Sequence, residues 1–140
     1  MVGDVNAPTN IDRTARRLHD DHVDFELRFD DLMGRALMGD WRDLDEAWSS
    51  FASDLCDHLV FEEQAVFPVY AEQSKECRRL VEKLTAEHET IRELLDEIGV
   101  SVQTHEVRAY TIAALVQLLR EHAALENTRI YPSIQPAVEA

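Results

Sequence analysis

Apolar residues recur at alternating steps of four and three positions through four long segments of the chain. This spacing places them along one stripe of an α-helix, as in helices that pack lengthwise against their neighbours. The first helix is predicted to be capped by Thr9 or Asn10 and to end at Gly39. Its stripe consists of Ile11, Ala15, Leu18, His22, Phe25, Phe29, Leu32 and Ala36.

The second helix is predicted to start near residues 41–43, and Pro68 should kink or end it because proline lacks a backbone N–H. Its stripe consists of Leu44, Trp48, Phe51, Leu55, His58, Glu62, Ala65 and Val69.

The third helix is predicted from about Ser74 to Val100, with Gly99 near its end. Its stripe consists of Cys77, Val81, Leu84, His88, Ile91, Leu95 and Ile98. The fourth is predicted from about Glu106 to Ile130, and Pro132 and Pro136 should close it. Its stripe consists of Ile112, Leu115, Leu119, His122 and Glu126, widened by Leu118 and Leu125.

Four helices joined by short connections predict an all-α fold, an up-down-up-down four-helix bundle. The domain is predicted to span residues 10–132, between a flexible N-terminus over residues 1–9 and a C-terminal tail over residues 133–140.

A motif of histidine, three residues, glutamate, four residues, an aromatic residue and proline occurs twice. It joins His58 and Glu62 to Pro68, and 64 residues later His122 and Glu126 to Pro132. A single histidine–glutamate pair has little weight, because 28 of the 140 residues are acidic and chance supplies such a pair about one time in five. The repeated proline register is much harder to obtain by chance, so the motif points to two related halves of one site.

Six polar residues occupy stripe positions that should be apolar: His22, His58, Glu62, His88, His122 and Glu126. Counted from the predicted turns near residues 40, 74 and 104, their levels along the bundle agree to roughly 3 to 6 Å at a rise of ~1.5 Å per residue. Buried charges are normally paired or bound to metal. Four imidazoles and two carboxylates suit iron, manganese or zinc better than calcium, so the pattern predicts a metal site.

The roles of other polar residues near the stripes remain open. His19 lies one turn from His22 and could replace it as a ligand, whereas His105 falls in a predicted turn. Glu26 has Arg92 as its counterpart in the repeat, which argues against a ligand role. Glu63 could hydrogen-bond a ligand or face water. Walls for the site are predicted from Phe25, Phe29, Leu55, Ile91, Leu118 and Leu125. The tryptophans, Tyr70 and Tyr131 are predicted to be packing residues, although Tyr131 could approach the open end of the bundle.

Composition narrows the possible partners. The net charge of −14 disfavours nucleic acid and anionic membranes. Cys56 and Cys77 lack the spacing of a thiolate zinc site. The sequence shows neither a transmembrane-length apolar run nor a signal pattern, so we expect a cytoplasmic protein that is a monomer or a homodimer. The face with Trp41 and Trp48 is compatible with a dimer.

The set of His22, His58-x3-Glu62, His88 and His122-x3-Glu126, with its aromatic–proline ends, resembles the hemerythrin-like (HHE cation-binding) domain family. The resemblance covers about residues 10–132. It implies two non-haem iron ions, each held by two of the histidines, with Glu62 and Glu126 as bridging carboxylates and an oxo or hydroxo bridge between the irons. It also implies open iron positions for O2, NO or peroxide.

The chain departs from the family's oxygen carriers. Their additional histidine on the third helix is missing, because Leu84 and Arg92 stand four residues from His88. Glu126 stands four residues after His122, where the oxygen carriers have aspartate five residues after. Both features look more like the branches that sense iron, handle NO or repair iron–sulfur clusters.

We therefore expect a di-iron protein that binds O2, NO or peroxide for sensing, storage or the handling of iron and oxidative stress, rather than a dedicated enzyme. An enzyme that reduces peroxide or NO, or donates iron for iron–sulfur repair, is the alternative. A metal-free acidic interaction module is a further one. A ferritin-like site is disfavoured because no glutamate stands three residues before any of the ligand histidines.

Overall fold

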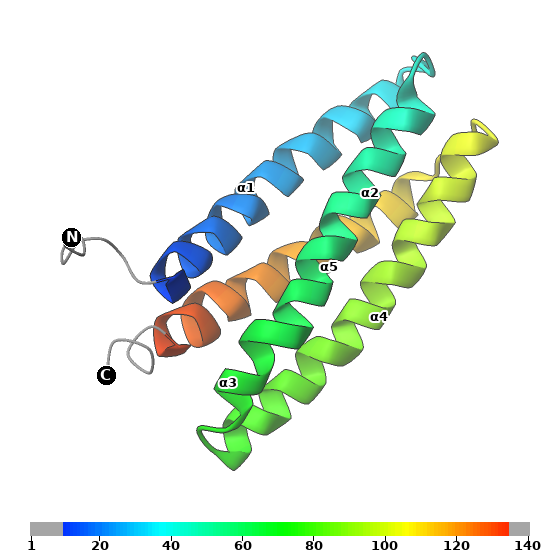
Figure 1. Cartoon of the computed structure of the whole chain (residues 1–140). Helices are drawn as coiled ribbons and strands as arrows, with labels where there is room; N and C mark the ends of the chain where they lie inside the picture. The colour runs from blue at the N-terminus through cyan, green and yellow to red at the C-terminus, as the bar shows by residue number, and fades with distance from the viewer. Residues whose placement is uncertain (1–9, 135–140) are drawn as a thin grey trace, which may run out of the picture.

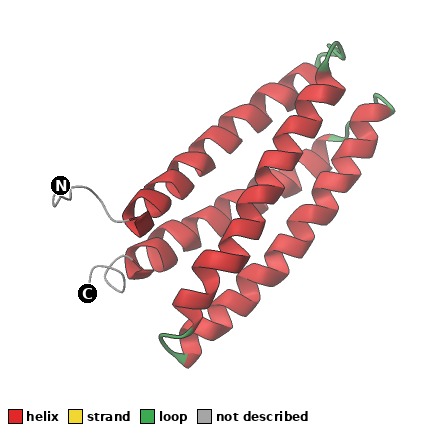
Figure 2. Ribbon diagram, in the orientation of Figure 1, coloured by secondary structure: helices red, strands yellow, loops and turns green. Residues whose placement is uncertain are grey.

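The predicted helices pack side by side as an antiparallel four-helix bundle (Figure 1). The computed structural model describes the backbone of residues 10–134 and the side chains of residues 16–134. Over this range the chain is helical with short turns and has no strand (Figure 2). The elements are α1 (Asn10–Leu37), α2 (Leu44–Phe61), η1 (Glu62–Val66), α3 (Phe67–Ala71), α4 (Lys75–Gln103), α5 (Ala109–Leu125) and η2 (Glu126–Ile130). The elements α2, η1 and α3 follow one another without a turn and make the second rod of the bundle.

The turns follow the expected local chemistry. Gly39 adopts a positive φ of 77° after α1, a conformation that glycine enters without a steric penalty. The hydroxyl of Ser74 accepts a hydrogen bond of 3.0 Å from the backbone N–H of Cys77 and so caps α4. The predicted cap at Thr9, the predicted stop at Pro136 and the predicted N-terminal segment over residues 1–9 lie outside the described residues. The prediction that Pro132 closes the last helix is wrong, because the helix continues to Ile134, which is buried; the rest of the predicted C-terminal tail is not described.

Two π-helical segments interrupt the α-helices, and each begins at a glutamate of the repeated motif. The backbone N–H of Phe67 bonds to the carbonyl of Glu62, and the N–H of Tyr131 bonds to the carbonyl of Glu126. Each wide turn adds one residue to the helix, which rotates everything after it. The prediction that Ala65 faces the core is therefore wrong: Ala65 is exposed, and the inward positions are those of Val66, Phe67 and Tyr70.

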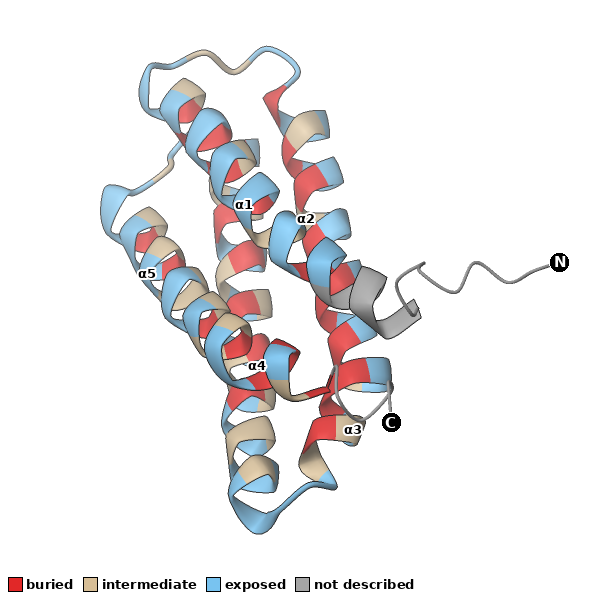
Figure 3. Cartoon of the chain, turned by 90° about the vertical axis from the view of Figure 1, so that its left-hand side faces the viewer, coloured by how far each residue is buried: buried red, intermediate tan, exposed pale blue. Residues whose placement is uncertain are grey.

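The core consists of two apolar clusters on either side of a polar layer. The larger is built around Phe29, Phe51 and Ile98. The smaller is built around Leu84, Phe67 and Ile130. Buried residues follow the inner face of every helix (Figure 3). Most predicted stripe positions are confirmed as buried, because a four–three spacing of apolar residues leaves a helix little choice of inner face.

The third predicted helix is longer than expected. It continues to Gln103, so Gly99 does not end it. Gly99 instead lies where a Cβ atom would come within 3.1 Å of Nε1 of Trp48. Trp48 is 4% exposed and belongs to the core, so the suggestion that it forms part of a dimer face is wrong. Trp41 stacks on His105 with ring centroids 4.4 Å apart.

The contact between Gly99 and Trp48 predicts a stability effect. Gly99→Leu should lower the free energy of unfolding by about 1–2 kcal/mol, because overpacking at the buried indole outweighs the gain in helix propensity. The matched control is Gly34→Leu, at an exposed helical position where a Cβ atom would meet nothing within 4 Å. The control should be neutral or stabilising in urea unfolding. Equal stabilisation by both substitutions would contradict the packing argument.

Candidate metal centre

The bundle brings all six predicted site residues to one level. His22 comes from α1 and His88 from α4. The remaining four are His58 at the end of α2, Glu62 at the start of η1, His122 at the end of α5 and Glu126 at the start of η2. Five of the six are buried, and the side chain of His22 is 12% exposed. The preference for His22 over His19 agrees with this placement, because His19 is exposed and outside the cluster.

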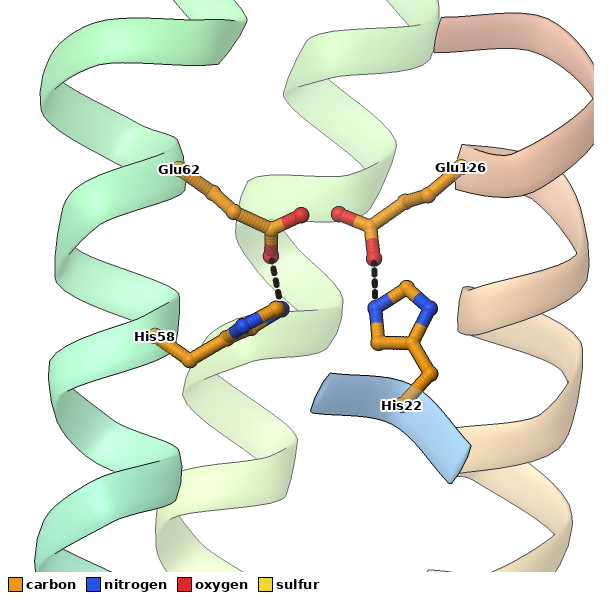
Figure 4. A group of neighbouring side chains, drawn as sticks. All are labelled: His22, His58, Glu62 and Glu126. Carbon is orange, nitrogen blue, oxygen red and sulfur yellow. Dashed lines mark ion pairs between the residues drawn. The ribbon is translucent and has the colours of Figure 1, made fainter. Parts of the chain in front are cut away.

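The six residues form two groups of four that could each hold a metal ion. One contains His22 and His58, the other contains His88 and His122, and both contain Glu62 and Glu126. Within each group the candidate ligand atoms all lie within 4.8 Å of one another. Figure 4 shows the first group, with the two carboxylates directed toward each other between the second and fourth rods of the bundle. The two candidate positions therefore share both carboxylates.

Each carboxylate contacts imidazoles on two helices. Glu62 Oε1 lies 3.5 Å from Nε2 of His58 and 3.3 Å from Nε2 of His88. Glu126 lies 3.2 Å from Nε2 of His22 through Oε1 and 3.3 Å from Nε2 of His122 through Oε2. All four histidines thus turn the same ring nitrogen toward the carboxylate pair.

Tyr131 is a member of the cluster that sequence reasoning treated mainly as packing. Its hydroxyl donates a 2.7 Å hydrogen bond to Oε2 of Glu62. It also lies 3.2 Å from Nε2 of His22. The π-helical segment before Tyr131 turns this side chain inward. The signal available in the sequence was the aromatic residue at the same place in both motifs, although its counterpart Phe67 has no hydroxyl.

Three carboxylates hydrogen-bond the outer nitrogens of three histidines. Glu63 Oε2 lies 2.9 Å from Nδ1 of His88, and Glu87 Oε1 lies 2.9 Å from Nδ1 of His122. Asp21 Oδ2 lies 3.2 Å from Nδ1 of His58. Such contacts fix the tautomer that presents Nε2 as a ligand and raise its basicity. Sequence reasoning had considered Glu63 for this role but had not identified Asp21 or Glu87.

The buried carboxylates perturb each other. Burial and the negative charge of Glu126 raise the pKa of Glu62 well above its usual range. Burial also opposes ionisation of Glu126, but hydrogen bonds with Glu62, His122 and His22 outweigh it and hold its pKa well below the usual range. Burial and the neighbouring carboxylates raise the pKa of the Tyr131 hydroxyl. These opposite shifts favour a single proton on the pair when no cation is bound.

Two of the imidazoles are kept neutral by their surroundings. Burial and the nearby His22 lower the pKa of His58 to about 4. Burial and the nearby His122 lower the pKa of His88. Burial acts in the same direction on His122, but hydrogen bonds to Glu126 and Glu87 outweigh it and raise its pKa. Nε2 of His88 and Nε2 of His122 lie 3.0 Å apart, within hydrogen-bond distance. A neutral imidazole is the form that binds metal.

Several polar atoms inside the cluster have no hydrogen-bond partner: Nε2 of His58, Oε1 of Glu62 and Oε2 of Glu126. Their contacts of 3.3–3.5 Å with cluster neighbours lack hydrogen-bond geometry. A buried polar atom without a partner costs about 1–3 kcal/mol, and all three atoms belong to residues of the two four-residue groups. Cations bound within these groups would satisfy them, so the residues present fit a metal site.

A cavity of about 270 Å³ reaches the cluster between α1 and α5. Its lining includes every residue of the group with His22 and His58, and also His122 of the other group, but not His88. Among the predicted wall residues, Phe25, Phe29 and Leu55 line it, whereas Ile91, Leu118 and Leu125 belong to the apolar clusters or pack against them. The cavity therefore lies beside the candidate position that contains His22 and His58.

The remaining candidates lie outside the cluster. Glu26 forms an ion pair of 2.6 Å with Arg120 on α5. His105 is exposed in the turn after α4. Cys56 and Cys77 are half-buried free thiols. Within residues 10–134, no helix combines the length and the apolar character that a membrane crossing requires.

A comparison with protein-family models matches residues 13–134 to the family described as the hemerythrin HHE cation binding domain. Searches of curated proteins and of solved structures returned no match.

The hydrogen bond between Tyr131 and Glu62 predicts a stability loss in the metal-free protein. Tyr131→Phe should lower the free energy of unfolding by about 1–3 kcal/mol, because it leaves a buried carboxyl without its donor. Tyr70→Phe is the control, since Tyr70 is equally buried in the same smaller apolar cluster, but its hydroxyl contacts Cys77 and Arg129 instead of a buried carboxyl group. Urea unfolding in the presence of a chelator measures both. A loss for Tyr131→Phe no larger than that for Tyr70→Phe would be evidence against the proposed role of the hydroxyl.

Proposed function

Because this chain belongs to the hemerythrin HHE cation-binding domain family, we propose that it holds two iron ions and binds a small diatomic molecule or oxidant beside them. The ligand class is O2, NO or peroxide, and the role is sensing, storage or the handling of iron and oxidative stress. The observation that supports this proposal best is the pair of four-residue groups that share Glu62 and Glu126.

The donor set favours iron over the harder cations. Each group offers two imidazole nitrogens and two carboxylate groups. Calcium and magnesium take oxygen ligands almost exclusively, whereas such mixed sets suit iron, manganese and zinc. The family match supports a metal cation as the cargo of this cluster. Bound iron would supply Lewis acidity and one-electron chemistry at this point of the bundle.

The chain's own residues hold the imidazoles ready. Asp21, Glu63 and Glu87 fix three of the four rings through Nδ1, so that Nε2 faces the carboxylates. The side chain of Arg92 in turn fixes Glu63 with contacts of 2.8 and 3.0 Å. This preorganisation lowers the entropy cost of metal binding, because the ligands need not be ordered at that moment.

The cavity supports a small ligand. Drug-sized ligands occupy pockets of roughly 300–1,000 Å³, and a cavity of about 270 Å³ lies below that range. Its inner wall is apolar, with Phe25, Phe29 and Leu59 among the lining residues. A diatomic molecule or peroxide fits this combination of size and polarity better than a charged metabolite does.

The cavity also favours binding over turnover. The titratable lining residues outside the cluster, His19, Glu26, Asp30 and Arg120, are all exposed. An enzyme that reduces peroxide or NO needs a positioned proton donor at the ligand, and the inner wall offers none besides the cluster itself. Steady turnover of peroxide or NO that is lost in Glu62→Ala would favour the enzyme instead.

The proposal predicts the metal content of histidine variants. Wild-type protein loaded with ferrous iron without oxygen and then desalted should hold two irons per chain, by elemental mass spectrometry. His58→Ala and His122→Ala should each lose stoichiometric binding of two irons, because each removes an imidazole donor from one of the two groups. His105→Ala, at an exposed histidine, is the matched control and should keep both irons. Retention of two irons in both cluster variants would refute the metal site.

A second prediction concerns the cavity. Ala123→Leu should fill part of it and weaken NO binding to the ferrous protein by about 5- to 150-fold, since crowding a packed site typically costs about 1–3 kcal/mol. Its iron content should not change, because Ala123 contributes no ligand. Ala113→Leu makes the same change at an exposed position of α5 outside the cavity, and its NO affinity should equal that of wild type. Optical titration measures both, and unaltered NO affinity in Ala123→Leu would rule out the cavity as the ligand site.

A further inference from the structure

The two halves of the site are related by the internal repeat, and the relation extends beyond the six cluster residues. His22 on α1 corresponds to His88 on α4, and Glu62 corresponds to Glu126. The residue after each glutamate also corresponds: Glu63 follows Glu62, and Asn127 follows Glu126. Contacts seen in one half can therefore be compared with the equivalent positions in the other.

Each hydrogen bond to an outer imidazole nitrogen comes from a residue beside a cluster residue in the sequence. Asp21 precedes His22 and contacts His58, and in the other half Glu87 precedes His88 and contacts His122. Glu63 contacts Nδ1 of His88. By the same relation, the residue that should contact Nδ1 of His22 is Asn127.

The structure shows two unpartnered atoms at this fourth contact. Nδ1 of His22 is buried and has no hydrogen-bond partner. Oδ1 of Asn127 is also buried and also lacks a partner. Both residues line the cavity between α1 and α5. A donor and an acceptor without partners therefore adjoin the same space, at the positions that the repeat relates to a formed hydrogen bond.

We propose that Asn127 is the positioning residue of His22, and that its Oδ1 accepts a hydrogen bond from Nδ1–H of His22 when a cation occupies the position that His22 and His58 share. This inference rests on the proposed function, because it requires two bound cations. With this hydrogen bond, each of the four cluster imidazoles would have an oxygen acceptor at Nδ1.

The difference between an amide and a carboxylate has a consequence for metal affinity. A carboxylate at Nδ1 makes the imidazole a stronger ligand than a neutral amide does. Glu63 is charged and is also held by Arg92, whereas Asn127 is neutral. The position with His88 and His122 therefore binds its cation more tightly and fills first, and the position with His22 and His58 fills second.

Titration of the metal-free protein with cobalt(II), followed by visible absorption, tests the proposal. Wild type should take up two equivalents in two steps. Asn127→Ala should weaken the second step by about 10- to 100-fold and leave the first unchanged. Asn127→Asp should restore the second step and strengthen it relative to wild type, which a merely structural role of the amide would not produce. Thermal unfolding with a chelator verifies that each variant is folded.

The matched variant is Glu63→Gln, which introduces the amide in the other half. It should weaken the first step and leave the second unchanged. Two steps with wild-type affinities in Asn127→Ala, or equal weakening of both steps, would overturn the inference and leave the two-cation site intact. Wild type that binds no cobalt would instead refute the proposed function itself, so the two failures are distinguishable.

Discussion

Two carboxyl groups face each other inside this bundle, and the surrounding arrangement depends on them. Glu62 and Glu126 are fully buried, and the negative charge of Glu126 together with burial opposes the ionisation of Glu62. Burial of two like charges is costly unless a proton or a cation lies between them. In the metal-free protein a shared proton and the hydroxyl of Tyr131 meet part of this requirement. A cation would meet it more fully, because it would also satisfy Nε2 of His58 and the carboxylate oxygens that lack hydrogen-bond partners.

The polar layer divides the core, so fold stability and site occupancy are linked. The larger apolar cluster lies on one side of the layer and the smaller one on the other. An apolar layer at this level would give a more stable metal-free protein, since buried ionic groups rarely repay their desolvation. The cluster residues lower the stability of the metal-free fold, and the same residues bind a cation only when the protein is folded. Cation binding should therefore raise the free energy of unfolding.

The four helices and the six cluster residues were accessible from sequence because helical periodicity is a direct consequence of burial. The stripes placed His22, His58 and His88 on inner faces without knowledge of any contact. The π-helical segments could not be predicted from the sequence. Each inserts one residue into the helix, and a four–three pattern shows this insertion only through the changed facing of the positions that follow it. For this reason Ala65 was wrongly assigned to the core and Tyr131 was assigned mainly to packing. Contacts such as that of Asp21 with His58 depend on which helices are neighbours, and periodicity does not carry that information.

The departures from internal symmetry fall on one side of the site. Tyr131 places a hydroxyl beside His22, whereas its counterpart Phe67 places a plain ring against His88 with centroids 5.1 Å apart. Asn127 is neutral and lines the cavity, whereas its counterpart Glu63 is held by Arg92. Tyr131 and Asn127 therefore both lie in the half with His22 and His58, the half whose cluster residues all line the cavity. A position that exchanges a ligand needs room and adaptable hydrogen bonds, while a position that only anchors a cation gains from rigid packing and charge. The two candidate positions thus share both carboxylates but differ in their histidines and in their surroundings.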